Sequence, residues 1–226
     1  MFLQPRKTIR ISALLSLVIG LSGAFSHRTE AAEASIVIDK YTGYILSGND
    51  INDKRQIASL TKIATGIVAI DWAARTGANL SQLASVPSAA LAQGGVNPVG
   101  LQPGDQLSLR DLIYSALMQS DNIAAYTIAH HIGIALSRTA DKKTRGLAPV
   151  DQFVAQMNAL ARGQGMERTL FLNPHGLDSR KGSQPYSTAA DVARLARYAM
   201  ANSGFRFYVS QKERKITINR AGAKLG

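Results

Sequence analysis

Hydrophobic and polar positions follow two different periods along this chain, and each period marks its own segments. Near the N-terminus, residues 34–39 alternate and are rich in β-branched side chains, residues 40–43 offer a turn that ends in a glycine, and residues 44–47 form a second short apolar run. Two such runs joined by a short turn are typical of a β-hairpin. We therefore expect an antiparallel pair of strands between residues 34 and 47.

The middle of the chain shows helical spacing instead. Apolar residues recur at this spacing after Ser59, and Gly77 offers a helix stop. Ser108 and Asp111 have the spacing of a capping box in front of a further apolar stretch. The pattern predicts helices over residues 59–74, 112–119, 122–134 and 150–162, and another that begins at residue 187 with Asp191 close behind.

Strand character is scarce in the rest of the chain. Residues 80–104 are rich in Gly, Pro, Ser and Asn, which indicates a loop-rich lobe. Strand-forming residues return at 215–219, with a weaker pattern at 169–172. A hairpin, a helical middle and a late strand predict an α+β fold, with one antiparallel sheet built from both chain ends beside a helical lobe.

The first residues have the pattern of an export signal. Arg6, Lys7 and Arg10 precede an apolar run of 15 residues, 11–25, and small residues follow at 31–34. The run is shorter than the roughly 20 residues of a membrane-spanning helix, which favours a cleaved signal peptide over an anchor. We assign residues 1–34 to a signal peptide cut between residues 31 and 34, residues 35–226 to one domain, and the protein to the periplasm or cell envelope.

Charge and composition exclude several classes of function. The net charge is +11, and removing residues 1–34 takes away four basic and two acidic groups, which leaves +9. The basic residues are scattered, without an arginine-rich run or interleaved aromatics, so nucleic acid is not an expected partner. Association with a membrane surface is compatible with this charge. The absence of cysteine excludes disulfides, thiolate metal sites and a cysteine nucleophile.

A serine becomes a nucleophile only beside a fixed base, and the sequence offers one. His130, His131 and His175 lie outside any Gly-x-Ser-x-Gly motif, and the adjacent pair would point about 100° apart on a helix, which suits a metal poorly. Lys62 follows Ser59 by three positions, on the same helix face. A lysine base must be neutral near pH 7, and burial lowers its pKa in that direction. We expect Ser59 as nucleophile, Lys62 as base, and neither metal nor cofactor.

A second triplet supports the catalytic interpretation. Ser-x-x-Lys alone is also met as a helix-capping serine followed by a solvated lysine. Ser120-Asp121-Asn122, however, follows the apolar run 112–118 at the junction of two predicted helices, where a short polar triplet is held rigidly. We therefore predict that Ser59 and Lys62 lie within hydrogen-bonding distance, and that Ser120 and Asn122 converge on them.

Together these motifs resemble a known group of enzymes. Ser59-Leu60-Thr61-Lys62 followed by Ser120-Asp121-Asn122 resembles the penicillin-recognising serine enzymes, which include β-lactamases and penicillin-binding proteins. Residues 34–43, 57–62, 173–178 and 187–191 are most similar to the low-molecular-mass D-alanyl-D-alanine carboxypeptidases. The resemblance runs from about residue 34 to the end and implies a β-lactamase/transpeptidase-like fold.

The resemblance also implies roles for the site residues. Ser59 attacks the carbonyl of the penultimate D-alanine of a peptidoglycan pentapeptide, Lys62 takes its proton, Ser120 relays a proton to the leaving group, and Asn122 holds the substrate amide. Water then hydrolyses the acyl-enzyme, and β-lactams acylate the same serine. A DD-endopeptidase, a β-lactamase of the same fold and a catalytically silent protein that binds the cell wall remain as alternatives.

One motif of the family is missing from the chain. Relatives carry Lys-Thr-Gly or Lys-Ser-Gly on a strand that lines the site, and this sequence contains neither triplet. Lys224-Leu225-Gly226 is similar but lacks the hydroxyl residue. We therefore expect that C-terminal strands are missing, that the hairpin and the strand at 215–219 present unpaired edges, and that this chain alone is poorly soluble and weakly active.

Other polar residues carry no catalytic expectation. Ser47-Gly48-Asn49 also fits Ser-x-Asn, but it lies at the end of the hairpin, where a turn is expected. His175 and Asp178 are interpreted as structural hydrogen-bonding residues. Glu167 lies two positions away from the spacing of the deacylating base of class A β-lactamases, so no such role is assigned to it.

Overall fold

The computed structural model describes residues 34–178, 182–220 and 223–225. All of them belong to one unit, which spans Ala34–Gly226. The predicted signal peptide lies outside the described residues, apart from its last residue, Ala34.

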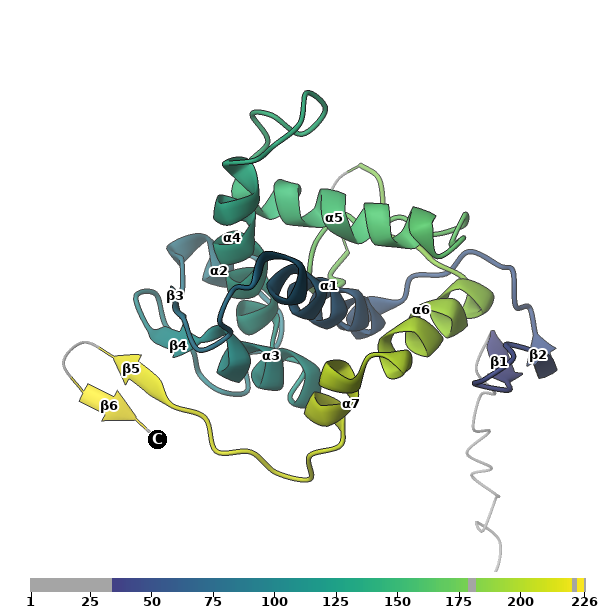
Figure 1. Cartoon of the computed structure of the whole chain (residues 1–226), viewed down its shortest axis with the longest axis horizontal. Helices are drawn as coiled ribbons and strands as arrows, with labels where there is room; N and C mark the ends of the chain where they lie inside the picture. The colour runs from purple at the N-terminus through teal and green to yellow at the C-terminus, as the bar shows by residue number, and fades with distance from the viewer. Residues whose placement is uncertain (1–33, 179–181, 221–222, 226) are drawn as a thin grey trace, which may run out of the picture. The chain divides into compact units, whose positions relative to one another are not determined.

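A bundle of helices around α1 forms the core of this unit (Figure 1). Helix α1, Thr61–Thr76, contacts five other helices. These are α3 (Leu109–Met118), α4 (Asn122–Ser137), α5 (Pro149–Gly163), α6 (Ala189–Ala201) and α7 (Ser203–Val209). Because α1 is surrounded, the residues at its start are held by several elements at once.

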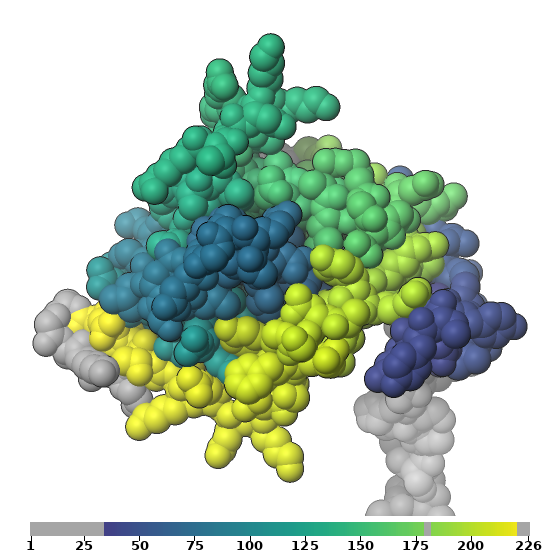
Figure 2. All heavy atoms as spheres, in the orientation of Figure 1, coloured from purple at the N-terminus to yellow at the C-terminus, as the bar shows by residue number. Residues whose placement is uncertain are grey.

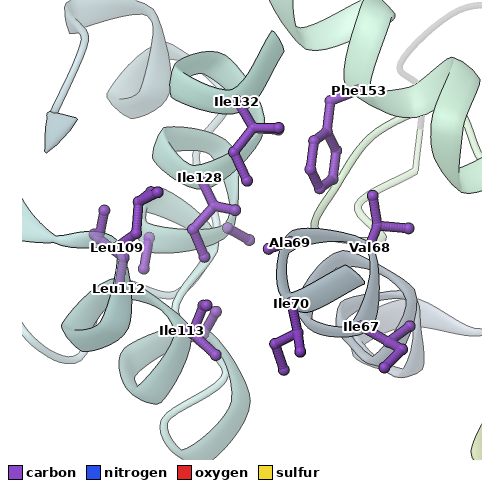
Figure 3. Close-up of a cluster of buried hydrophobic side chains, with 14 of the residues drawn as sticks. Ile67, Val68, Ala69, Ile70, Leu109, Leu112, Ile113, Ile128, Ile132 and Phe153 are labelled. Atoms are coloured by element: carbon purple, nitrogen blue, oxygen red, sulfur yellow. The ribbon is translucent and has the colours of Figure 1, made fainter. Parts of the chain in front are cut away.

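Apolar side chains from α1, α3, α4 and α5 meet at the centre of the bundle. In Figure 3, Ile128 and Ile132 of α4 point toward Phe153 of α5 and toward the face of α1 that carries Val68 and Ala69. Ile128, Ile132 and Phe153 are completely buried. Each large apolar side chain removed from water contributes about 1.5–3 kcal/mol. This burial, more than intrinsic helix propensity, fixes the position of α1.

The ends of the helices follow their predicted capping signals. The Ser108 hydroxyl accepts a hydrogen bond from the Asp111 N–H at the start of α3, and Gly77 ends α1 with a left-handed φ of 70°. Helix α1 begins at Thr61 instead of Ser59, because Ala58–Leu60 form a separate 3-10 turn.

Two short helices, α2 (Ser88–Ala92) and α7, were not predicted. Within the described ranges no helix is both long enough and apolar enough to cross a membrane.

The predicted N-terminal hairpin is confirmed. Strands β1, Ser35–Ile38, and β2, Ile45–Asn49, pair antiparallel and form a two-stranded sheet of their own. The Asp39 carboxylate accepts hydrogen bonds from the N–H groups of Tyr41 and Thr42, which fixes the turn between the strands. Every side chain of β2 is exposed.

A second, four-stranded antiparallel sheet corrects the predicted strand arrangement. Its order is β3-β4-β5-β6, formed by Leu83–Ser85, Gln106–Ser108, Ile218–Arg220 and Ala223–Leu225. The expectation that both chain ends share one sheet is therefore wrong for the described residues, and so is the expectation of an unpaired edge at 215–219, because β5 lies between β4 and β6. Strand β3 lies inside residues 80–104, whose Gly and Pro content indicated loops, and the three-residue strand β4 follows that segment and ends at the capping residue Ser108.

Arg220 explains why the late strand joins β4. Its guanidinium donates two hydrogen bonds to the Asp105 carboxylate, at 2.7 and 2.6 Å, and one to the Gly100 carbonyl at 2.8 Å. Asp105 is almost completely buried, and the hydrogen bonds from Arg220 lower the pKa of its carboxyl. A buried carboxylate without this partner would be costly, so the pair ties β5 to the loop before β4.

Gly133 provides a test of the packing between α4 and α5. A Cβ atom at this position would overlap the backbone carbonyl of Pro149, which cannot rotate away. Although alanine favours a helix by about 1 kcal/mol over glycine, we expect Gly133→Ala to lower the free energy of unfolding by about 1–3 kcal/mol. Urea denaturation followed by circular dichroism measures this difference.

Gly163 is the matched control, because it ends α5 and a Cβ atom there meets nothing within 4 Å. Gly163→Ala should leave the stability unchanged or raise it by up to about 1 kcal/mol. If both variants unfold at the same urea concentration, the close approach of the two helices is not present.

Candidate active site

Ser59 lies in the 3-10 turn just before α1 and is exposed. The residue before it, Ala58, has a φ of 43°, in the left-handed region that is unfavourable for a residue with a side chain. Such backbone strain persists only where neighbouring structure enforces it, and it concentrates at functional sites. The turn therefore presents the Ser59 hydroxyl in a position that the rest of the fold imposes.

Two predicted site residues contact the Ser59 hydroxyl. The Lys62 amine donates a hydrogen bond to Ser59 Oγ at 3.1 Å, and the Ser120 hydroxyl donates one at 2.9 Å. The first contact follows from the three-residue spacing at the start of the helix, and the second joins positions 61 residues apart. The predicted convergence of Ser59, Lys62 and Ser120 is confirmed.

Ser120 is held by the junction between α3 and α4. It is the second non-glycine residue at the site with a left-handed backbone, at a φ of 58°. The next residue, Asp121, is the N-cap of α4, and its carboxylate accepts hydrogen bonds from the N–H groups of Ile123 and Ala124. Burial nevertheless raises the pKa of the Asp121 carboxyl. The cap fixes the direction in which Ser120 leaves α3.

A third segment, residues 173–177, packs against the start of α1 from far along the chain. The Lys62 amine donates to the His175 carbonyl at 3.0 Å, and the Thr65 hydroxyl donates to the Pro174 carbonyl at 2.6 Å. Gly176 lies so close to the Ala58 carbonyl that a Cβ atom would overlap it. Lys62 is therefore fixed between the Ser59 hydroxyl and a backbone carbonyl.

Asn173 shapes this segment through its side chain. Its amide oxygen accepts from the N–H groups of His175, at 3.2 Å, and Gly176, at 2.6 Å, and its amide nitrogen donates to the Leu177 carbonyl at 2.7 Å. These three hydrogen bonds close a tight turn. The turn aims the His175 carbonyl at Lys62.

Burial changes the titration of the groups around Ser59. Lys62 is 2% exposed, and this burial lowers the pKa of its amine from 10.5 to about 8, against the opposing effect of the negative charge on Asp121. Burial, together with the charge on Lys62, lowers the pKa of His175 from 6.5 to about 4. The Lys62 amine is therefore neutral in a substantial fraction of molecules slightly above pH 7. The His175 imidazole is neutral at the same pH.

A pocket of about 460 Å³ opens beside these groups. Ser59, Lys62 and Ser120 line it, together with apolar residues of α1 and α3. Asn122 does not line it and is 3% exposed. Its N–H donates to the Val96 carbonyl at 2.9 Å, and its side-chain nitrogen faces Gly95. The substrate-binding role of Asn122 stays a prediction.

The other polar residues weighed in the sequence analysis do not line the pocket at Ser59. Ser47 pairs with Val37 inside the hairpin, in a strand instead of a turn. Glu167 and Asp178 are exposed. His131 pairs with the Gln82 side chain at 3.1 Å. No cluster of His, Asp or Glu suited to a metal occurs among the residues that the structure describes.

The sequence analysis found residues 173–178 similar to the family but did not predict that residues 173–177 contact Lys62 and Thr65. This segment acts through the backbone carbonyls of Pro174 and His175, which no side-chain pattern reveals. The signal present in the sequence was Asn173 followed by Gly176, a pair typical of a tight turn.

Comparisons with known proteins identify relatives of this chain. The family model described as D-alanyl-D-alanine carboxypeptidase, peptidase family S11, matches residues 22–225. The D-alanyl-D-alanine carboxypeptidase DacC of Escherichia coli is 29% identical over 218 residues, 92% of this chain and 50% of the relative. DacB2 of Mycobacterium tuberculosis is 35% identical over 174 residues, 77% of this chain and 52% of the relative. The chain thus spans about half the length of these relatives.

A solved structure shows the same fold. The crystal structure of a D-alanyl-D-alanine carboxypeptidase from Mycobacterium tuberculosis superposes with a TM-score of 0.68 at 30% identity, over 85% of this chain and 64% of that one. The predicted α+β, transpeptidase-like fold is therefore confirmed. With the family model matched across most of its length, the chain belongs to the D-alanyl-D-alanine carboxypeptidase family.

Proposed function

We propose that this protein is a serine-type D-alanyl-D-alanine carboxypeptidase, which trims peptidoglycan stem peptides through an acyl-enzyme on Ser59. One observation carries the proposal: the Ser59 hydroxyl lies 3.1 Å from a buried lysine amine whose pKa is about 8. The proposal places the protein in the periplasm or cell envelope, on the basis of its N-terminal export pattern and a substrate found there.

The proposed reaction begins with proton transfer. Neutral Lys62 takes the Ser59 proton as Oγ attacks the carbonyl carbon of the penultimate D-alanine, and a tetrahedral intermediate forms. Ser120, which contacts the same Oγ, passes a proton to the departing nitrogen. The C–N bond breaks, D-alanine leaves, and an ester on Ser59 remains. Water then attacks the ester carbon and gives up a proton to Lys62, and the C–O bond to Ser59 Oγ breaks. The shortened peptide leaves with a new carboxylate, and Ser59 Oγ regains its proton.

Lys62 suits the role of base better than any other titratable group near Ser59. His175 has a pKa of about 4, so its imidazole binds a proton too weakly to activate a serine effectively. Asp121 is engaged as the N-cap of α4. Of these three groups, Lys62 lies in direct hydrogen-bonding contact with Ser59 Oγ, where its neutral amine can accept the hydroxyl proton, and its pKa lies close to physiological pH.

In this proposal the Asn122 side chain binds the substrate amide. The segment that covers Asn122 must move for this contact to form. The segment with Gly95 and Val96 covers its side chain, so this segment must shift before the Asn122 amide can reach a ligand beside Ser59. Gly94 and Gly95 both have left-handed φ values, 75° and 84°, and supply a backbone tolerant of such a change.

One alternative rests on a specific observation. The sequence lacks the Lys-Thr-Gly triplet that resemblance would place beside the substrate carboxylate, which favours a catalytically silent protein that binds the cell wall. The β-lactamase alternative has less support. Glu167, the residue compared above with the deacylating base of class A β-lactamases, is exposed and does not line the pocket at Ser59. A DD-endopeptidase would use the same serine and lysine on a different peptide.

Covalent labelling tests the proposal directly. The purified chain, and any longer natural form, is incubated with a fluorescent penicillin, and the labelled peptide is identified by mass spectrometry. We expect one penicilloyl group on Ser59 and none in Ser59→Ala, with D-alanine released from a pentapeptide by the form that labels. Folded protein that is not labelled in either form would establish the silent alternative.

Lys62→Arg isolates the function of the base. A guanidinium stays protonated at any relevant pH, so it cannot accept the Ser59 proton, although it keeps the positive charge and much of the length. We expect acylation by the fluorescent penicillin to be abolished, with thermal unfolding close to that of the unmodified chain.

Lys54→Arg serves as the control for Lys62→Arg. Lys54 is exposed and lies 4.2 Å from the centre of the Tyr186 ring, a contact that arginine also makes. We expect the fluorescent penicillin to label Lys54→Arg as fast as it labels the unmodified chain. Rapid acylation of folded Lys62→Arg would assign the base to another residue.

Gly176→Ala tests whether the 173–177 segment sets the geometry of the site. Gly176 and Gly182 both have a φ of 84°, so alanine incurs the same backbone strain at either position. A Cβ atom at residue 176 would overlap the Ala58 carbonyl, whereas one at residue 182 meets nothing within 4 Å. We expect Gly176→Ala to slow acylation by about 100-fold, as a displacement near 1 Å can do. Gly182→Ala should keep its rate, and equal rates would contradict this account.

A further inference from the structure

A second concave site lies between the hairpin and the C-terminal helices. A cleft of about 820 Å³ is bordered by the turn after β1, the end of α5, helix α6 and the start of α7. The hairpin and α6 lie next to each other in Figure 2, in purple and yellow-green. None of the residues that line this cleft also lines the pocket at Ser59.

The cleft gathers positive charge. Four cations from three different segments line it: Lys40, Arg194, Arg197 and Arg206. Among the described residues that line the cleft, none carries a carboxylate. Two carboxylates lie next to these cations: Asp39, whose pKa is lowered by hydrogen bonds from the turn after β1 and by the charge of Arg197, and Asp191, which is 3% exposed and pairs with Arg194. Four cations beside two carboxylates leave the cleft with a positive balance. Charges of one sign in a concave surface reinforce each other and attract an anion.

Two of the three arginines, Arg194 and Arg206, are held in place before any ligand binds. Arg206 donates from one nitrogen to the carbonyls of Met200, at 2.7 Å, and Ala201, at 3.0 Å, at the end of α6. Arg194 pairs with Asp191 at 2.8 Å while half of its side chain stays exposed. A guanidinium has five N–H donors, so these contacts leave donors that can bind carboxylate or phosphate oxygens. Fixed donors reduce the entropy lost on binding.

Two aromatic rings add a flat surface to the cleft. Tyr41 is 79% exposed at the tip of the hairpin, and the Lys40 amine lies 4.6 Å from the centre of its ring. The Tyr198 hydroxyl donates to Asp71 at 2.7 Å, which fixes its ring in the wall. The exposed Tyr41 ring suits the face of a sugar ring, and the half-buried Tyr198 ring forms part of the wall beside it. A lipid surface is flat and would touch the rim of this concavity only, so the shape favours a chain that enters it.

We propose that this cleft binds an anionic glycan, a carbohydrate chain that carries carboxylate or phosphate groups. The arginines and Lys40 take the negative groups, and Tyr41 and Tyr198 contact sugar rings. The site is separate from Ser59 and does not depend on the chemistry there. It would hold the protein on an acidic polymer.

The test measures binding of a fluorescein-labelled polygalacturonate oligomer to the purified chain by fluorescence anisotropy at low salt. The cleft variant is Lys40→Gln/Arg197→Gln, and the control with the same change of net charge is Lys142→Gln/Lys143→Gln, at two exposed lysines outside the cleft. Circular dichroism verifies that both are folded. Penicillin labelling, measured in parallel, should be the same in both.

We expect the cleft variant to bind about tenfold or more weakly and the control to bind within about twofold of the unmodified chain, because only the cleft variant loses two cations that donate to the anionic groups. Equal weakening in both variants would overturn the proposal in favour of net charge alone. Equally tight binding of neutral dextran would refute the requirement for anionic groups. Tighter, cleft-dependent binding to phosphatidylglycerol vesicles would replace the glycan with a membrane.

Discussion

The burial of one amine, that of Lys62, is the constraint on which the rest of the site depends. An ammonium group removed from water is strongly disfavoured, so burial lowers its pKa from 10.5 to about 8. The amine nevertheless keeps two hydrogen-bond acceptors, Ser59 Oγ and the His175 carbonyl. Asp121 keeps the pKa from falling further. The helical core around α1 makes this possible, because it surrounds the start of the helix with packed elements.

Close backbone packing completes the arrangement and explains its unusual conformations. Ala58 and Ser120 both adopt left-handed backbone angles. Ala58 directly precedes Ser59 in the chain, and the Ser120 hydroxyl donates to Ser59 Oγ. Gly176 lets the 173–177 segment approach the Ala58 carbonyl, and Asn173 holds that segment in shape. The strain at Ala58 and Ser120 is offset by burial and capping elsewhere, which is the usual relation between a rigid fold and a reactive site.

Local signals in the sequence predicted much of this structure. Helical spacing located α1 and α3–α6, and the pairing of Ser59 with Lys62 followed from a three-residue offset on one helix face. The four-stranded sheet was missed because β3 and β4 are three residues long and are held by distant partners such as Arg220. The contact of the 173–177 segment with Lys62 was missed because it is made by a backbone carbonyl oxygen, which every residue possesses. The covering of Asn122 by Gly95 likewise depends on a tertiary contact.

The most direct test of this account is the pKa of the Lys62 amine itself, which can be measured whether or not the chain is active. Lysine labelled with ¹³C at Cε is followed by NMR between about pH 6 and 12, and the Lys62 signal is assigned by its loss in Lys62→Arg. We expect this one signal to titrate at about 8, well below the value of about 10.4 that is ordinary for a lysine amine in water. A Lys62 signal that titrates at that ordinary value would contradict the central claim.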